Sequence, residues 1–160
     1  MNAFTIRFAE AADVDTILAL IQELADFERE PDAVKTTRED LLRDGFGEQV
    51  RFECFLAERE GETLGFLLFF PTYSTWTGRL GIHLEDLYVR PDFRGQGVGK
   101  ALLARSAALL RERGGVRLEL NVLDWNTSAA EVYAHLGFKR SAEWFGYRME
   151  GPAVDALASG

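Results

Sequence analysis

Three glycines in five residues, Gly95, Gly97 and Gly99, form the most specific local feature of this sequence. Glycine lets the backbone turn tightly and approach a ligand closely. The residues after Gly97 show helical spacing, and the start of a helix presents unpaired N–H groups and a positive dipole end. With Arg94 and Lys100 beside it, the loop is suited to bind an anion such as pyrophosphate. A tight strand-to-helix turn without a ligand would use the same glycines.

Two common phosphate-binding loops do not fit this pattern. A P-loop requires glycine at position 94 and serine or threonine at position 101, where the chain has Arg94 and Ala101. A dinucleotide-binding fingerprint requires glycine at position 100, where Lys100 stands, and an acidic residue about 20 positions further on. The pattern that remains is Arg-x-x-Gly-x-Gly over residues 94–99.

A second candidate group lies in residues 126–138. Asn126 is placed to cap a helix, and Tyr133 follows seven residues later, two helical turns on and therefore on the same face. Gly137 can end that helix in a left-handed conformation. An isolated tyrosine at this place would also suit a packed core.

Two adjacent carboxylates, Glu85 and Asp86, stand just before the glycine loop. Neighbouring residues on a strand point to opposite faces, so both can face one site only if the strand bulges there. Each could instead be a solvated charge at a strand end, just as Glu28 could be a solvated acid at a helix end.

Hydrophobic periodicity predicts the elements that position these residues. Alternating or apolar runs predict strands at 4–8, 52–58, 63–70, 80–89 and 116–123, with the last strands at Phe138 and 143–149. Helical spacing predicts a helix that Asp13 can cap and that stops before Pro31. It also predicts a short helix opened by Thr36 or Thr37, with Glu39 or Asp40 placed for a capping box, and helices at 97–113 and 126–136. Gly45 and Gly47 are expected to end the short helix. The order β-α-α-β-β-β-α-β-α-β is that of a mixed α/β fold, and we expect one domain over 1–160 with a weakly helical or frayed tail at 151–160.

Composition narrows the function further. The 160 residues carry a net charge of −8, from 26 acidic and 18 basic residues. This balance opposes sequence-independent nucleic-acid binding and favours cationic partners. No apolar run is long enough for a membrane span, and the lone Cys54 cannot form an internal disulfide, so we expect a cytoplasmic protein. Cys54 has the pattern of a buried strand thiol, and His83 and His135 lack metal-ligand spacing.

Both candidate motifs resemble the GNAT superfamily of N-acetyltransferases. Arg-x-x-Gly-x-Gly at 94–99 is similar to its pyrophosphate loop, and residues 126–138 match its signature Asn-x-x-Ala-x-x-x-Tyr-x-x-x-Gly-Phe. The likeness covers about residues 3–150. Segments typical of the diamine acetyltransferase subfamily occur at 6–7, 11–13, 44–48, 84–89 and 124–126. Residues 73–76 and 122–126 look most like its thialysine branch, whereas the polyamine branch has an acidic residue in place of Ser74.

The resemblance implies a largely antiparallel sheet flanked by helices, a homodimer, acetyl-coenzyme A as co-substrate and no metal. It implies acetyl transfer to a small primary amine, either a thialysine- or lysine-like amino acid or a diamine. Tyr133 would protonate the departing thiolate, and Glu85 would be the general base, acting through a water. The residues implied to bind the cofactor are Leu87, Tyr88, Val89, Arg94, Gly95, Gln96, Gly97, Val98, Gly99, Lys100, Asn126 and Tyr133.

For the acceptor, Asp86 and Glu28 would hold the cation, while Tyr73 and Trp76 would line its methylenes and offer a cation–π face. Two other interpretations stay open. The same chemistry could act on a protein amine or an antibiotic amine, or the chain could bind coenzyme A without turnover. Tyr133 and Glu85 argue against the second, because a pure binding module would need neither.

Overall fold

The computed structural model describes residues 3–160, which contain a five-stranded sheet of order β1-β2-β3-β4-β5. All neighbouring strands are antiparallel except β4 and β5, which are parallel. The predicted mixed, largely antiparallel sheet is therefore confirmed. The strands are β1 (Thr5–Phe8), β2 (Glu53–Arg59), β3 (Glu62–Ser74), β4 (Arg79–Val89) and β5 (Arg117–Leu120).

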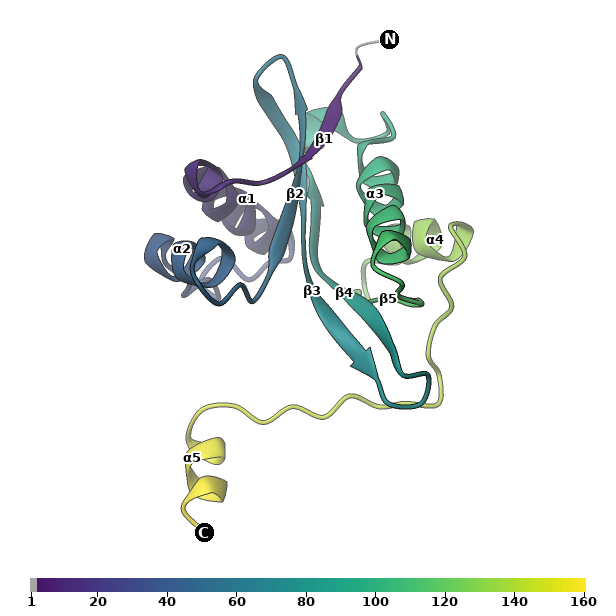
Figure 1. Ribbon diagram of the computed structural model, residues 1–160. Coiled ribbons are helices and arrows are strands. Elements are labelled where there is room, and N and C mark those ends of the chain that lie inside the picture. Colours follow the sequence, from purple (N-terminus) through teal and green to yellow (C-terminus); the bar gives the residue numbers. More distant parts are fainter. Residues whose placement is uncertain (1–2) are drawn as a thin grey trace. The chain divides into compact units, whose positions relative to one another are not determined.

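Helices cover both faces of this sheet. In Figure 1, α1 and α2 lie on one side of it and α3 lies on the other. The helices are α1 (Val14–Phe27), α2 (Arg38–Phe46), α3 (Val98–Glu112), α4 (Thr127–His135) and α5 (Pro152–Ala158), with short 3-10 turns η1 (Ala11–Asp13) and η2 (Pro91–Phe93). None of the helices in residues 3–160 has the length and apolar character to cross a membrane.

Consecutive side chains along β2 and β3 are buried, because they point to the two faces of the sheet in turn and helices cover both faces (Figure 1). Cys54, Leu56, Phe66 and Leu68 pack in one cluster with residues of α1 and α2. Between them in sequence, Phe55 is also fully buried, and Arg105 of α3 lies over its ring at 5.2 Å from the centroid. The predicted buried thiol of Cys54 is confirmed, and burial raises its pKa.

Local capping signals behave as predicted at α2 but not at α1. Thr37 and Asp40 form a capping box, in which each side chain accepts a hydrogen bond from the backbone N–H of the other residue. Asp13 stands at the N-cap position of α1, yet its side chain does not cap that helix. Its carboxylate instead accepts two hydrogen bonds from Arg7, at 2.7 and 2.9 Å, and one from the backbone N–H of Glu10 at 2.7 Å. The carboxylate therefore closes the 3-10 turn before α1 and pairs with Arg7, and it does not cap the helix.

The chain divides into two compact units, with the division between Asn121 and Val122. The second unit contains α4 and α5, and the tail is helical at Pro152–Ala158. The strands predicted at Phe138 and 143–149 are wrong, because the structure has no strand at these residues. A strand needs a neighbour to pair its N–H and C=O groups, and within residues 3–160 this segment has none. The single domain over 1–160 stays a prediction.

Candidate active site

A β-bulge in β4 explains how the adjacent carboxylates of Glu85 and Asp86 can face one site. Leu68 of β3 pairs with Asp86, but the next residue, Phe69, pairs with Leu84. Glu85 is therefore the extra residue of the bulge and has no partner in β3. The bulge places Asp86 opposite Leu68, a member of the cluster that packs against α1 and α2.

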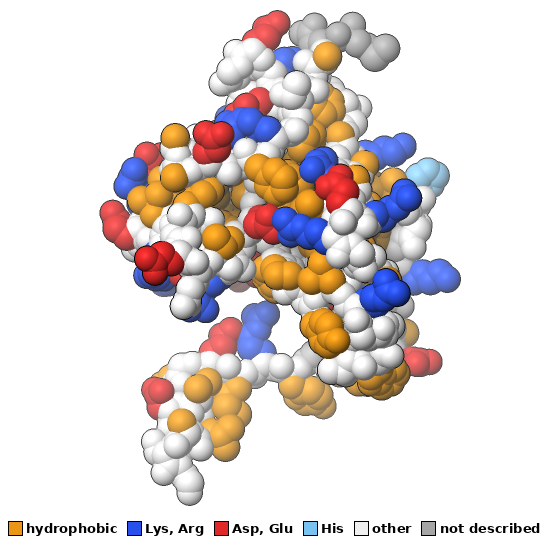
Figure 2. Space-filling view, in the orientation of Figure 1, with side chains coloured by type: hydrophobic (Ala, Val, Ile, Leu, Met, Phe, Trp, Pro, Cys, Tyr) orange, Lys and Arg blue, Asp and Glu red, His pale blue; other side chains and the backbone are white. Residues whose placement is uncertain are grey.

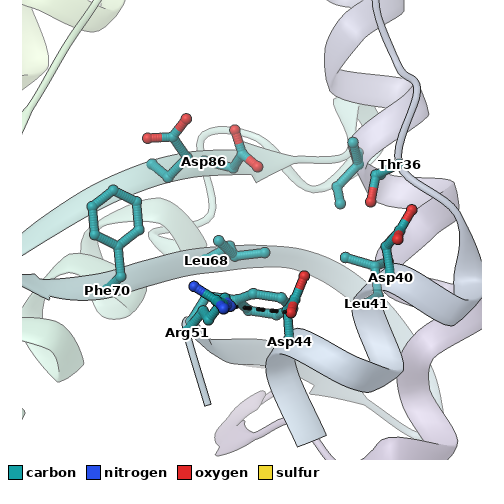
Figure 3. A pocket seen from close by; sticks show the side chains of 11 residues that line it. Thr36, Asp40, Leu41, Asp44, Arg51, Leu68, Phe70 and Asp86 are labelled. Atoms are coloured by element: carbon teal, nitrogen blue, oxygen red, sulfur yellow. Dashed lines mark ion pairs between the residues drawn. The ribbon is translucent and has the colours of Figure 1, made fainter. Parts of the chain in front are cut away.

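Both carboxylates line one pocket, shown in Figure 3. Its volume is about 390 Å³, a size that suits a small molecule. Helix α2 and the segment after it form one side, and strands β3 and β4 form the other. The lining residues are Ile21, Thr36, Asp40, Leu41, Asp44, Arg51, Phe52, Leu68, Phe70, Glu85 and Asp86.

The ionised form of Asp86 is destabilised by its surroundings in the pocket. Its pKa is raised from 3.8 to about 6, mainly by burial and further by the negative charges of Glu85 and Glu28. Glu28, just after α1, does not line the pocket, but its charge acts on Asp86 and burial raises its own pKa. An ammonium ion near Asp86 would relieve this strain, since an opposite charge stabilises the ionised carboxylate.

Glu85 is more exposed and has a partner that the sequence did not reveal. Its Oε2 lies 3.2 Å from Nε2 of His83, and half of the Glu85 side chain is accessible to solvent. The His83 ring is largely buried and stacks on Phe70, with 5.0 Å between ring centroids. His83 therefore contacts Glu85 beside the pocket. The sequence had indicated only that His83 lacks metal-ligand spacing.

The glycine loop has the geometry of an anion-binding site at a helix N-terminus. Gly95 and Gly97 have φ values of 75° and 84°, and no atom of residues 3–160 lies within 4 Å of a Cβ built at either position. Gly97 is the N-cap of α3, so the first N–H groups of that helix border the open loop. A pyrophosphate fits such a site, because it needs close backbone approach and unpaired donors.

Side chains around the loop keep it in shape. Arg94 donates from Nε to the carbonyl of Val89 at 2.8 Å, and its guanidinium lies over the rings of Phe27 and Tyr88. Gln96 donates to the carbonyl of Asp92 at 3.0 Å. Both residues were predicted to bind the cofactor, and these contacts show them fixing the loop.

Strand β4 offers a backbone edge next to the same loop. Strand β5 pairs with β4 only from Gly81 to Leu84. Over 85–89, β4 has no described strand on that side, so backbone groups near Leu87, Tyr88 and Val89 border an open edge. An amide-containing chain such as pantetheine can pair with an edge of this kind.

Two predicted acceptor residues do not line the pocket. Tyr73 and Trp76, at the turn between β3 and β4, have 67% and 89% of their surface exposed. Ser74 is buried between them, and its hydroxyl accepts a hydrogen bond from the N–H of Thr77. A role for Tyr73 and Trp76 in acceptor binding stays a prediction.

The second unit holds the other half of the sequence signature. Asn126 caps α4 as predicted, since its side-chain oxygen accepts a hydrogen bond from the N–H of Ala129. Tyr133 is half-buried and its ring meets Phe138 edge-on, with 5.7 Å between centroids. Gly137 has a φ of 99°, which is the predicted left-handed helix end. The roles of Asn126 and Tyr133 at the cofactor stay predictions.

Four polar residues of the pocket were not identified as site residues from the sequence: Thr36, Asp40, Asp44 and Arg51. Asp44 belongs to the segment 44–48 that carried the subfamily resemblance, and this was the one signal that could have marked it. The distribution of surface charge does not mark the pocket, because Figure 2 shows acidic and basic side chains intermingled on the face it presents.

Comparisons with known proteins agree with this fold and these motifs. The model of the acetyltransferase (GNAT) family matches residues 17–138. The thialysine N-epsilon-acetyltransferase of Sus scrofa is 41% identical over 99% of both chains. An integron cassette protein from V. cholerae has a similar fold, with a TM-score of 0.84 at 21% identity over 100% of this chain and 99% of that one. An aminoglycoside N-acetyltransferase in complex with coenzyme A has a TM-score of 0.74 at 21% identity, covering 93% of this chain and 96% of that one. The chain therefore belongs to the GNAT acetyltransferase family and is an N-acetyltransferase.

Proposed function

We propose that this enzyme transfers the acetyl group of acetyl-coenzyme A to a primary amine of a small cationic acceptor. The acceptor would be a thialysine- or lysine-like amino acid or a diamine. The observation that carries the proposal is the pocket into which the β4 bulge brings both Glu85 and Asp86. Apolar side chains such as Leu68 and Phe70 beside two carboxylates suit an alkyl chain that ends in an ammonium. The name of the Sus scrofa relative supports the same acceptor class.

The glycine loop and the β4 edge fit the co-substrate. Residues 94–100 would hold the pyrophosphate through backbone N–H groups at the start of α3, with Arg94 and Lys100 adding positive charge. Leu87, Tyr88 and Val89 would pair with the pantetheine amides and polarise the thioester carbonyl. When bound, acetyl-coenzyme A supplies an acetyl group that is activated as a thioester.

Proton removal is the main chemical task of the pocket. An alkyl amine has a pKa of about 10.4, so at pH 7 it is an ammonium that cannot attack a carbonyl. Asp86, with Glu28 behind it, would attract and orient this cation. Glu85 would then accept a proton through a bridging water, and the neutral amine would be the nucleophile. Attack is direct, without a covalent enzyme intermediate.

Tyr133 is the proposed general acid. Its phenol would give a proton to the departing sulfur of coenzyme A, so that the leaving group is a neutral thiol. Support comes from the match of residues 126–138 to the family signature. Asn126 would contribute a contact to the cofactor from the start of α4.

A thiol-release assay with acetyl-coenzyme A tests the proposal. The acceptor panel is thialysine, lysine, ornithine, diaminopropane, putrescine and spermidine, with Tyr133→Phe and Glu85→Gln beside the unmodified enzyme. We expect turnover on thialysine that falls by about 100-fold or more in both variants, in line with the usual effect of removing a general acid or base. Full activity in either variant would remove that residue from the mechanism.

The same assay separates the alternatives. Preference for spermidine would mean that Ser74 is a poor guide to the acceptor. Tight coenzyme A binding without turnover on any amine of the panel would favour a protein or antibiotic amine, or a binding module. A homodimer, a cytoplasmic location and the absence of a metal cofactor belong to the same proposal, and they rest on the family resemblance and composition. Light scattering of the purified protein tests the dimer.

A further inference from the structure

The pocket carries a second charged group beyond the carboxylates of Glu85 and Asp86. In Figure 3, Leu68 lies between Asp86 and an ion pair formed by Asp44 and Arg51. Nε of Arg51 is 3.3 Å from Oδ1 of Asp44. The pocket therefore has carboxylates on β4, an apolar middle, and a paired negative and positive charge beside α2.

The backbone and helix α2 hold this pair in place. The N–H of Arg51 donates to the carbonyl of Asp44 at 2.6 Å, which fixes the segment after α2 against the helix. Arg43 donates to both carboxylate oxygens of Asp44, at 3.0 and 2.6 Å. These hydrogen bonds lower the pKa of Asp44 and keep it ionised.

The guanidinium of Arg51 has donors left for a ligand. Among residues 3–160 it makes one ion pair, through Nε, and 69% of its side chain is exposed. Its two terminal nitrogens form the fork that binds a carboxylate with two parallel hydrogen bonds. A ligand carboxylate bound to this fork would lie next to Asp44. Oδ2 of Asp44 accepts one hydrogen bond, from Arg43, and can accept a second from an ammonium.

We propose that the Asp44–Arg51 pair binds the α-amino and α-carboxylate groups of an amino-acid acceptor, while the distal amine of that acceptor lies at Asp86 and Glu85. The proposal rests on the acetyl-transfer function above and adds how the acceptor class is selected. The α-carboxylate binds Arg51, the α-ammonium binds Asp44, and the methylenes lie along Leu68 and Phe70. A diamine has no group for Arg51, so the pair favours amino acids over diamines of equal length.

Two acceptors that differ in one group test this selection. Thialysine is S-(2-aminoethyl)cysteine, and bis(2-aminoethyl) sulfide is the same chain without the carboxylate. Steady-state kinetics are measured on both for the unmodified enzyme, Arg51→Gln and Arg51→Lys. The control is Arg38→Gln, which removes an exposed arginine that pairs with Asp15 at 3.0 Å and does not line the pocket.

Arg51→Gln is expected to lower kcat/KM for thialysine by tenfold or more, mainly through KM, and to change it less than twofold for the diamine. Arg51→Lys keeps the charge without the fork, so its loss on thialysine should be intermediate. Arg38→Gln should leave both acceptors unchanged.

Two results would overturn the inference, and each has a different meaning. Equal changes on the two acceptors, in an Arg51→Gln protein that melts at the temperature of the unmodified enzyme, would show that Arg51 does not read the carboxylate. In that case acetyl transfer itself stands. No turnover of either acceptor by the unmodified enzyme would overturn the proposed function together with this inference.

Discussion

Asp86 gives the sharpest test of the pocket, because its ionised form destabilises the folded protein. The pKa of Asp86 is about 6 in the folded state against 3.8 for an ordinary aspartate. A shift of about 2 pKa units corresponds to about 3 kcal/mol between the two protonation states. Folding therefore favours the protonated form, and replacement by the neutral, isosteric asparagine in Asp86→Asn should stabilise the protein at neutral pH.

The sign of the pH dependence follows from the raised pKa. The stabilisation by protonated Asp86 is complete below pH 3.8, where the unfolded chain is also protonated, and is lost as the pH rises through about 6. Relative to the unmodified protein, Asp86→Asn should gain about 3 kcal/mol at pH 7.5 and about half of that at pH 5. The variant should also bind the amine poorly, because asparagine lacks the negative charge that attracts an ammonium.

Urea unfolding at several pH values between 5 and 8 measures this difference. The contrasting variant is Asp13→Asn, because hydrogen bonds from Arg7 lower the pKa of Asp13 and its loss should destabilise the protein at neutral pH. A gain for Asp86→Asn that does not change between pH 5 and 7.5 would refute the titration argument. No gain at pH 7.5 would refute the claim that ionised Asp86 is strained.

Other substitutions test the parts that surround the pocket. His83→Phe removes the 3.2 Å contact with Glu85 and should lower kcat about fivefold without changing the KM for acetyl-coenzyme A; an unchanged kcat would contradict a positioning role. Gly97 and Gly114 have φ values of 84° and 71° and lie at the two ends of α3. Gly97→Ala and Gly114→Ala should each lower the free energy of unfolding in urea by about 1–2 kcal/mol. Only Gly97→Ala should raise the KM for acetyl-coenzyme A. Arg7→Met breaks hydrogen bonds to two carboxylates and should lower stability by about 1–2 kcal/mol at pH 7, a modest loss because solvent screens the exposed part of the network.

Features that depend on a few neighbouring residues were predictable. A capping box formed at Thr37 and Asp40, one of the pairs that the sequence allowed, and the cap at Asn126 and the left-handed Gly137 formed where the sequence placed them. Each of these interactions spans three or four residues, or depends on the φ angle of one glycine. Family membership followed from the same kind of signal, since both signature motifs are continuous in sequence.

Features that depend on partners outside the predicted element were missed or misplaced. Asp13 was expected to cap α1, but its carboxylate accepts hydrogen bonds from Arg7 and from the backbone N–H of Glu10. The segment 143–149 is rich in aromatic residues, yet composition cannot supply the neighbouring strand that pairs its backbone. In both cases the outcome depended on the presence or absence of a partner outside the predicted element.

The sequence by itself determined the class of chemistry: a glycine loop at the start of a helix, an Asn–Tyr helix face, and two acids before the loop. The tertiary structure decided which groups share a pocket. The register of β3 against β4 makes Glu85 a bulge and turns Asp86 toward α2, where Asp44 and Arg51 lie. Strand register and helix packing join residues about 40 positions apart, and no local spacing encodes such contacts.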